Sequence, residues 1–100
     1  MNLNIISSSN TMTGRFSGRL DNAAVAKASL DMRMLADNAD KHIILDCSGL
    51  QFISLTGMQL FHQLHEAAAA RGGRISIQGV AATLMQLFTA TGFASLLNFE

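Results

Sequence analysis

The clearest hydrophobic pattern runs through residues 43–68 of the chain. It begins with a continuous apolar run, Ile43–Leu45, which is typical of a strand that is buried on both faces. A second short apolar segment, Leu50–Ile53, follows, and from Met58 to Ala68 apolar residues recur at steps of three and four, which predicts a helix. The residues between the two apolar segments break the run and predict a turn; they include Asp46, Ser48 and Gly49.

Ser54 stands directly before this helix and is well placed as its N-cap. The free amides of Leu55, Thr56 and Gly57 would then form the positive end of the helix. A short loop between a strand and a helix start is where α/β domains commonly build sites. We therefore expect any functional site to lie here.

Two strands and a helix are predicted before this region. Asn2–Ser7 and Thr11–Ser17 alternate between apolar and polar residues around a turn-forming cluster, which predicts an antiparallel pair. Gly18–Asp21 ends the second strand, and Asp21 or Asn22 is expected to cap a helix that closes in Asp37–Lys41. The apolar stripe of that helix comprises Ala24, Ala28, Met32 and Leu35.

After the central helix, Arg71–Gly73 supplies a basic residue and a glycine C-cap. Arg74–Gln78 alternates as a strand, and Ala81–Ala90 is a further predicted helix. The chain closes in a short strand or packed tail that contains Leu96, Leu97 and Phe99. The order β-β-α-β-α-β-α-β predicts one α/β domain over residues 1–100, with a mixed sheet, parallel in its centre, and helices packed against it.

Composition narrows the class of protein. Seven basic and seven acidic residues cancel, so the chain lacks the basic surface expected of a nucleic-acid-binding or anionic-membrane-binding protein. Cys47 is the single cysteine, which excludes an internal disulfide and fits a reducing compartment. The chain shows neither a signal peptide nor an apolar run long enough to span a membrane. These features predict a small cytoplasmic domain without direct membrane insertion.

Three motifs carry a resemblance to a known family. They are Gly18–Asp21, Ile44–Ile53, and Arg71–Arg74 followed by a strand and a helix that ends in Thr91–Phe93. Together with the element order, they resemble the STAS domain family of the bacterial anti-sigma factor antagonists. The resemblance covers nearly the whole chain. It implies a STAS-like fold and a signal-transduction role in transcription regulation, in which the domain binds a kinase-like anti-sigma factor and frees a sigma factor by partner switching.

The chain departs from the family at the regulatory motif. There the family normally reads Asp-Ser-Ser-Gly or Asp-Ser-Ala-Gly, and the anti-sigma kinase phosphorylates the first serine. The same positions here read Ser54, Leu55, Thr56 and Gly57. Because leucine has no hydroxyl group, position 55 cannot accept a phosphate, and we favour a domain that binds its partner constitutively. The alternative is a shifted acceptor at Thr56 or Ser54, next to the helix N-terminus.

No catalytic constellation or cofactor site emerges, so an enzyme is not predicted. His62, His65 and Glu66 could share a helix face, but the helical phase places His65 toward the core and His62 outside, which disfavours a metal site. Cys47 is expected to be a small core residue without a nearby base. Asp46 is expected to bind the backbone of the following turn.

A protein-binding surface is the favoured site. Its expected members are Asp21, Ser54, Leu55, Thr56, Gly57, Met58, Gln59 and His62. An apolar residue at a helix start, rimmed by polar ones, suits a modest binding patch, although a solvated helix face with one stray leucine has the same pattern.

Two other functions stay open. A non-phosphorylated accessory subunit of a lipid-transport ABC ATPase is one, because stand-alone domains of the resembled family also serve there. A small anion or nucleotide sensor at the helix N-terminus is the other, and the lack of arginine or lysine in residues 46–60 weakens it. The sequence leaves a homodimer open.

Overall fold

The computed structural model describes residues 1–100 and contains one four-stranded sheet in the order β1-β2-β3-β4. The strands are β1 (Asn2–Ser7), β2 (Thr11–Leu20), β3 (His42–Ile53) and β4 (Arg74–Gln78). β1 and β2 are antiparallel, whereas the pairs β2–β3 and β3–β4 are parallel. The predicted mixed sheet with a parallel centre is therefore confirmed.

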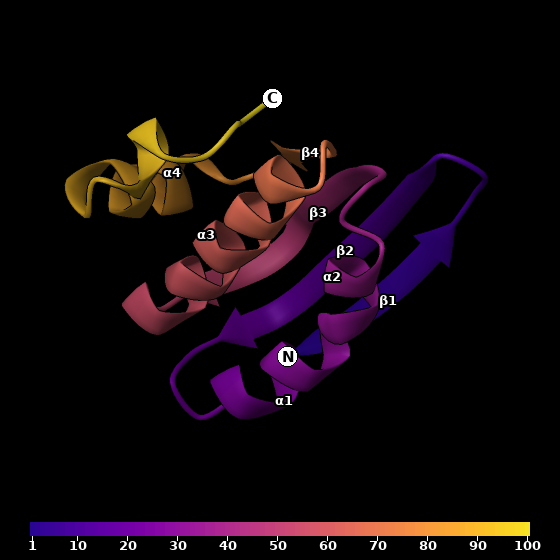
Figure 1. The fold of residues 1–100 in the computed structure, drawn as a ribbon. Coiled ribbons are helices and arrows are strands. Elements are labelled where there is room, and N and C mark those ends of the chain that lie inside the picture. The colour runs from indigo at the N-terminus through magenta and orange to yellow at the C-terminus, as the bar shows by residue number, and fades with distance from the viewer.

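The helices lie on one side of this sheet (Figure 1). They are α1 (Val25–Asp31), α2 (Arg33–Asp37), α3 (Leu55–Ala70) and α4 (Ala82–Ala90), followed by the 3-10 helix η1 (Phe93–Ser95). α1 and α2 cover β1 and β2, and α3 runs across the middle of the sheet (Figure 1). None of the helices combines the length and apolar composition needed to cross a membrane.

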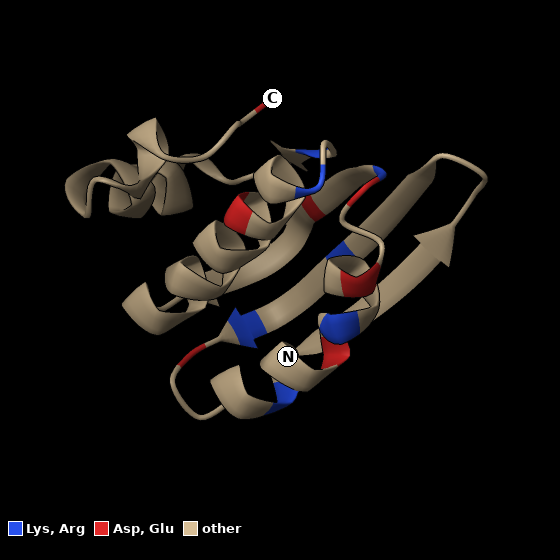
Figure 2. Ribbon diagram, viewed as in Figure 1, with Lys and Arg blue, Asp and Glu red and all other residues tan.

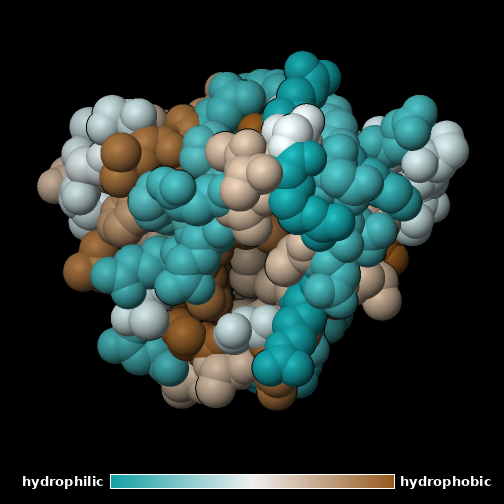
Figure 3. Space-filling view, in the orientation of Figure 1, coloured by the Kyte–Doolittle hydropathy of each residue, from teal (hydrophilic) through white to brown (hydrophobic).

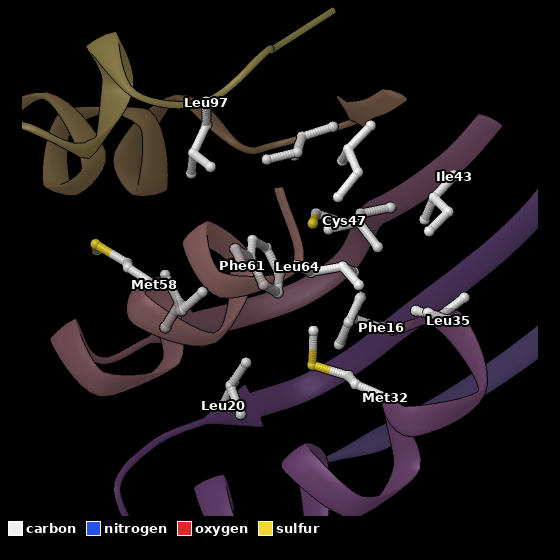
Figure 4. Close-up of a cluster of buried hydrophobic side chains, with 14 of the residues drawn as sticks. Phe16, Leu20, Met32, Leu35, Ile43, Cys47, Met58, Phe61, Leu64 and Leu97 are labelled. Carbon is white, nitrogen blue, oxygen red and sulfur yellow. The ribbon is translucent and has the colours of Figure 1, made fainter. Parts of the chain in front are cut away.

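The core fills the space between α3 and the sheet (Figure 4). Phe61 of α3 stands at its centre, with ring centroids 5.1 Å from Phe16 of β2 and 6.4 Å from Phe88 of α4. The apolar α3 side chains that recur at steps of three and four are buried; they are Met58, Phe61, Leu64 and Ala68. The helix is thus held by its apolar face, as the periodicity predicted.

β3 differs from its prediction in two ways. Ile43 and Leu45 are buried, but Ile44 between them is only partly covered, because the other sheet face has no helix layer. The strand also continues through the predicted turn to Ile53. Its pairing with β2 shifts register after Arg15 and again after Gly18, so the turn-forming residues 46–49 make a bulge inside a strand.

The segment before β3 also departs from prediction. β2 runs on through Leu20, and the single helix expected from Asp21 or Asn22 is instead two short helices, α1 and α2, that meet at Met32. The N-cap of α1 is Ala24, and residues 22–24 form a turn. The apolar stripe holds, since Ala28, Met32 and Leu35 are buried.

α3 ends in a glycine turn, and the chain ends in an extended tail. α3 stops at Ala70, where Gly72 has φ +76° and the Gly73 amide donates to the Ala68 carbonyl at 2.9 Å, which confirms the glycine C-cap. The last residues form an extended tail, in which Phe99 bridges to Ile77 at the outer edge of β4.

Candidate protein-binding site

The start of α3 is tied to the end of β2. The Ser54 amide donates to the Leu20 carbonyl at 2.8 Å, and Ser54 Oγ accepts the Gly57 amide at 3.1 Å. Ser54 has extended backbone angles, φ −81° and ψ 168°, which suit an N-cap. The predicted cap is therefore confirmed, and the first turn of α3 is rigidly placed beside the sheet.

Gly57 brings this first turn against the strands. A methyl group at Gly57 would lie 2.9 Å from both Leu20 Cγ and Ile53 Cγ1, which is closer than side chains tolerate. Glycine at position 57 thus allows the helix start to pack directly on the ends of β2 and β3. Gly57 is needed here because only a residue without a side chain lets α3 approach the two strands this closely.

The structure divides the predicted surface into exposed and buried members. Leu55 is 51% exposed, and it is the only large apolar side chain of α3 that is exposed to solvent. Thr56 and Gln59 are exposed, and His62 is partly covered. We refer to these four residues, Leu55, Thr56, Gln59 and His62, as the helix-start patch.

Gly57 and Met58 do not belong to that exposed patch. Both are buried, because Gly57 faces β2 and β3 while Met58, at 2% exposure, turns toward the end of α4. There the Thr91 hydroxyl donates to Met58 Sδ at 3.3 Å. Their predicted place on the binding surface is corrected to one beneath it, where they support the patch.

His62 joins the patch to the end of the chain. Its Nε2 lies 3.1 Å from Glu66 Oε1, and its ring meets Phe93 edge-on with centroids 6.1 Å apart. The sequence did not predict Phe93 as a neighbour of the patch, since Thr91–Phe93 was interpreted only as a helix end. Gly92 was the available sign that the chain turns here, because glycine readily adopts the positive φ, +83°, that the turn requires.

Asp21 lies next to the start of α3, because it follows Leu20, the residue that accepts the Ser54 amide. Its Oδ1 accepts the Ala24 amide at 3.1 Å, so it stabilises the turn before α1 instead of capping the helix itself. Its side chain is partly buried beside the patch.

Arg19 supplies a positive charge near residues 46–60 although it lies on β2, outside that stretch of sequence. β2–β3 pairing places it opposite Phe52, and its guanidinium carbon lies 4.5 Å above the centre of that ring. Leu20 and Ile53 point into the core, so Arg19 and Phe52 lie on the opposite, helix-free face. The positive charge is therefore near the ends of these strands but on the far face of the sheet from α3.

Asp46 and Cys47 have structural environments. Asp46 Oδ1 accepts the Ser48 amide at 3.0 Å and the Ser48 hydroxyl at 2.7 Å, as the sequence predicted for the backbone contact. These hydrogen bonds, aided by Arg15, lower the pKa of the Asp46 carboxyl. Cys47 is 1% exposed and is a core residue, as predicted, and this burial raises the pKa of its thiol to about 12.

The helix-start patch is a surface, not a pocket. The hollow that the structure does contain, about 400 Å³, lies on the helix-free face and is lined by Asn2, Asn4, Arg15, Phe16, Ser17, Asp46, Ser48 and Gly49. No group of three or more His, Cys, Asp or Glu side chains is placed to hold a metal ion. In Figure 3 the surface over α4 and the first turns of α3 mixes apolar and hydrophilic side chains, while the surface over α2 is mostly hydrophilic.

The sequence of this chain matches the model of one protein family. The family model described as "Mlab, STAS domain" matches residues 5–98. A search of curated proteins found no match by sequence.

Among solved structures, the unphosphorylated anti-sigma factor antagonist SpoIIAA aligns with a TM-score of 0.74 at 18% identity, over 99% of this chain and 87% of that chain. An anti-sigma factor antagonist from Mycobacterium paratuberculosis aligns with a TM-score of 0.85 at 11% identity, over 98% and 83%. A single-residue variant of RsbS from Moorella thermoacetica gives 0.78 at 12% identity, over 100% and 86%. At these identities, the three structures establish a shared fold.

Proposed function

Because the chain belongs to the STAS domain family, we propose that it is a non-enzymatic regulator of the anti-sigma factor antagonist type that binds a kinase-like anti-sigma factor. Binding occurs through the helix-start patch, with Asp21 and Ser54 at its border. The partner is a protein; neither a metal nor a cofactor takes part.

The observation that carries this proposal is the exposure of Leu55. The other large apolar side chains on the buried face of α3 are at most 4% exposed, whereas Leu55 stands half in solvent at a rigidly capped helix start. Covering the remaining half of this side chain at an interface contributes about 0.8–1.5 kcal/mol, so it suits the centre of a modest protein contact. Thr56 and Gln59 supply the polar rim.

In our proposal this chain binds its partner constitutively, without a phosphorylation switch. Leu55 occupies the position of the family's phosphoacceptor and offers no hydroxyl. Ser54 Oγ is already engaged by the Gly57 amide, which leaves Thr56 as the exposed hydroxyl of the patch. Incubation with the recovered kinase and ATP should leave the mass of the protein unchanged. A mass gain of one phosphate would contradict constitutive binding, and its location at Thr56 would identify a shifted acceptor.

The binding site is tested by a pull-down from native lysate, with wild type, Leu55→Asp and Met34→Asp as baits. Met34 is the matched control, since it is 55% exposed and belongs to α2, which lies away from the first turn of α3 (Figure 1). Burying a carboxylate at the interface is unfavourable, so Leu55→Asp should recover about tenfold less kinase-like ATPase than wild type. Met34→Asp should recover as much as wild type.

Two outcomes would overturn the proposal. Equal recovery by wild type and Leu55→Asp would remove the helix-start patch as the interface. Recovery of transporter ATPase subunits from the membrane fraction, in place of a kinase-like ATPase, would assign the protein to lipid transport.

A further inference from the structure

The two edges of the sheet differ in whether another segment covers them. The outer edge of β4 is covered by the C-terminal tail: the Ile77 amide donates to the Asn98 carbonyl at 2.8 Å, and the Glu100 amide donates to the Ile77 carbonyl at 2.7 Å. At the other edge, β1 pairs only with β2, and no segment lies beyond it (Figure 1). The molecule thus has one open edge.

The hydrogen bonds of the β1–β2 hairpin show which groups of β1 are free. The Ser8 amide donates to the Thr11 carbonyl at 2.8 Å, so Ser8 and Thr11 are a hydrogen-bonded pair. Hydrogen-bonded and non-bonded pairs alternate along an antiparallel ladder, which directs the groups of the even-numbered β1 residues toward β2. The amides and carbonyls of Leu3, Ile5 and Ser7 therefore point outward.

β1 lacks the features that usually protect an edge strand. It contains no charged residue and no proline, and its pairing with β2 runs without a bulge. In Figure 2 the strand is uncoloured along its whole length. Ile6 is 48% exposed on it. An uncharged edge of this kind is a template for an added strand.

We propose that a second copy of the chain pairs with this edge, β1 against β1 in antiparallel orientation, to form a two-fold symmetric dimer with one continuous sheet. Antiparallel pairing of identical strands is self-complementary, as a two-fold interface requires. The two-fold axis passes beside Asn4. Leu3 of each copy then stands opposite Ile5 of the other, and each of these pairs exchanges both backbone hydrogen bonds.

This register also suits the side chains. Leu3 and Ile5 are partly buried on the helix side of β1, and pairing places them against Ile5 and Leu3 of the second copy, where they extend the apolar layer across the junction. The absence of charge on β1 means that no like charges meet. One short strand pair buries little area, so the dimer should be reversible and concentration-dependent.

Cross-linking tests the register. The two Asn4 residues form a non-hydrogen-bonded pair with Cα atoms about 4.5 Å apart, within the range that a disulfide spans. Full-length Asn4→Cys, Ile6→Cys and Ser9→Cys are oxidised with glutathione and compared on non-reducing gels. Cys47 does not interfere, because it is 1% exposed. Two cysteines at position 6 would lie roughly 14 Å apart in this register, and position 9 lies in the hairpin turn.

We expect Asn4→Cys to dimerise about tenfold faster than the two controls. Asn4→Lys places like charges face to face and should stay monomeric in sedimentation velocity at concentrations where wild type dimerises. Rates no faster than the controls, with wild type monomeric throughout, would overturn the proposal and leave an extended segment of another protein as the occupant to test. Fastest cross-linking of Ile6→Cys would overturn the register. The helix-start patch lies on α3, so a failed pull-down and a failed cross-link are separate results.

Discussion

Asp46 is the residue whose charge contributes most clearly to local structure. Its carboxylate accepts the amide and hydroxyl of Ser48 inside the bulge of β3, and its Oδ2 lies 3.4 Å from Arg15 Nε on the neighbouring strand. All three contacts favour the ionised form, so the folded chain holds the pKa of Asp46 below its ordinary value of 3.8. The bulge is therefore stabilised by a charge.

Asp46→Asn should make this contribution measurable. A lowered folded pKa means that the stabilisation is complete above the unfolded pKa and is lost as pH falls through the folded pKa. We expect the variant to be less stable than wild type by about 1 kcal/mol at pH 6 in urea titrations. The difference should shrink between about pH 5 and pH 2. A difference that stays constant over this range would contradict a role for the charge.

At the scale of elements, the contact between α3 and the ends of β2 and β3 depends on Gly57. Alanine is ordinarily the better helix former by about 1 kcal/mol. Here its methyl group would press on Leu20 and Ile53, both fully buried. The packing cost exceeds the propensity gain, because neither side chain has open space to move into.

Gly57→Ala should therefore be destabilised by about 1–3 kcal/mol in urea unfolding. Gln59→Ala, at an exposed position of the same helix, is the control and should change the free energy of unfolding by less than about 0.5 kcal/mol. A midpoint for Gly57→Ala at or above that of wild type would show that the helix start can move away from the strands.

At the scale of the whole molecule, the C-terminal tail connects the last residues to the core. The Phe99 ring meets Phe88 edge-on with centroids 5.0 Å apart, and Phe88 in turn stacks near Phe61 in α3. The tail also covers the edge of β4 through Ile77. The same few residues thus close the sheet edge and complete the aromatic cluster.

Phe99→Ala should lower the free energy of unfolding by about 2 kcal/mol, since Phe99 is only partly buried. It should also speed hydrogen exchange of the Ile77 amide, which donates to Asn98. Leu96→Ala, at a side chain 48% exposed, is the control and should leave that exchange rate nearly unchanged. Equal exchange in all three proteins would show that the tail is not held by Phe99.

The sequence by itself determined the order of the strands and helices through α4, apart from the split of the first helix, together with the Ser54 cap, the glycine end of α3 and the missing hydroxyl at position 55. These features depend on periodicity, local backbone preference and covalent structure, which neighbouring residues decide. The bulged course of β3 was missed because strand pairing overrode the local turn signals, and the break at Met32 was missed because no glycine or proline marks it.

Only the tertiary structure decided which distant residues come together and which edge of the sheet is covered. It placed Thr91 against Met58, Phe93 beside His62 and Arg19 over Phe52. It also covered the edge of β4 with the C-terminal tail while leaving β1 open. Each of these outcomes depends on segments far apart in the chain, so no local pattern could encode it.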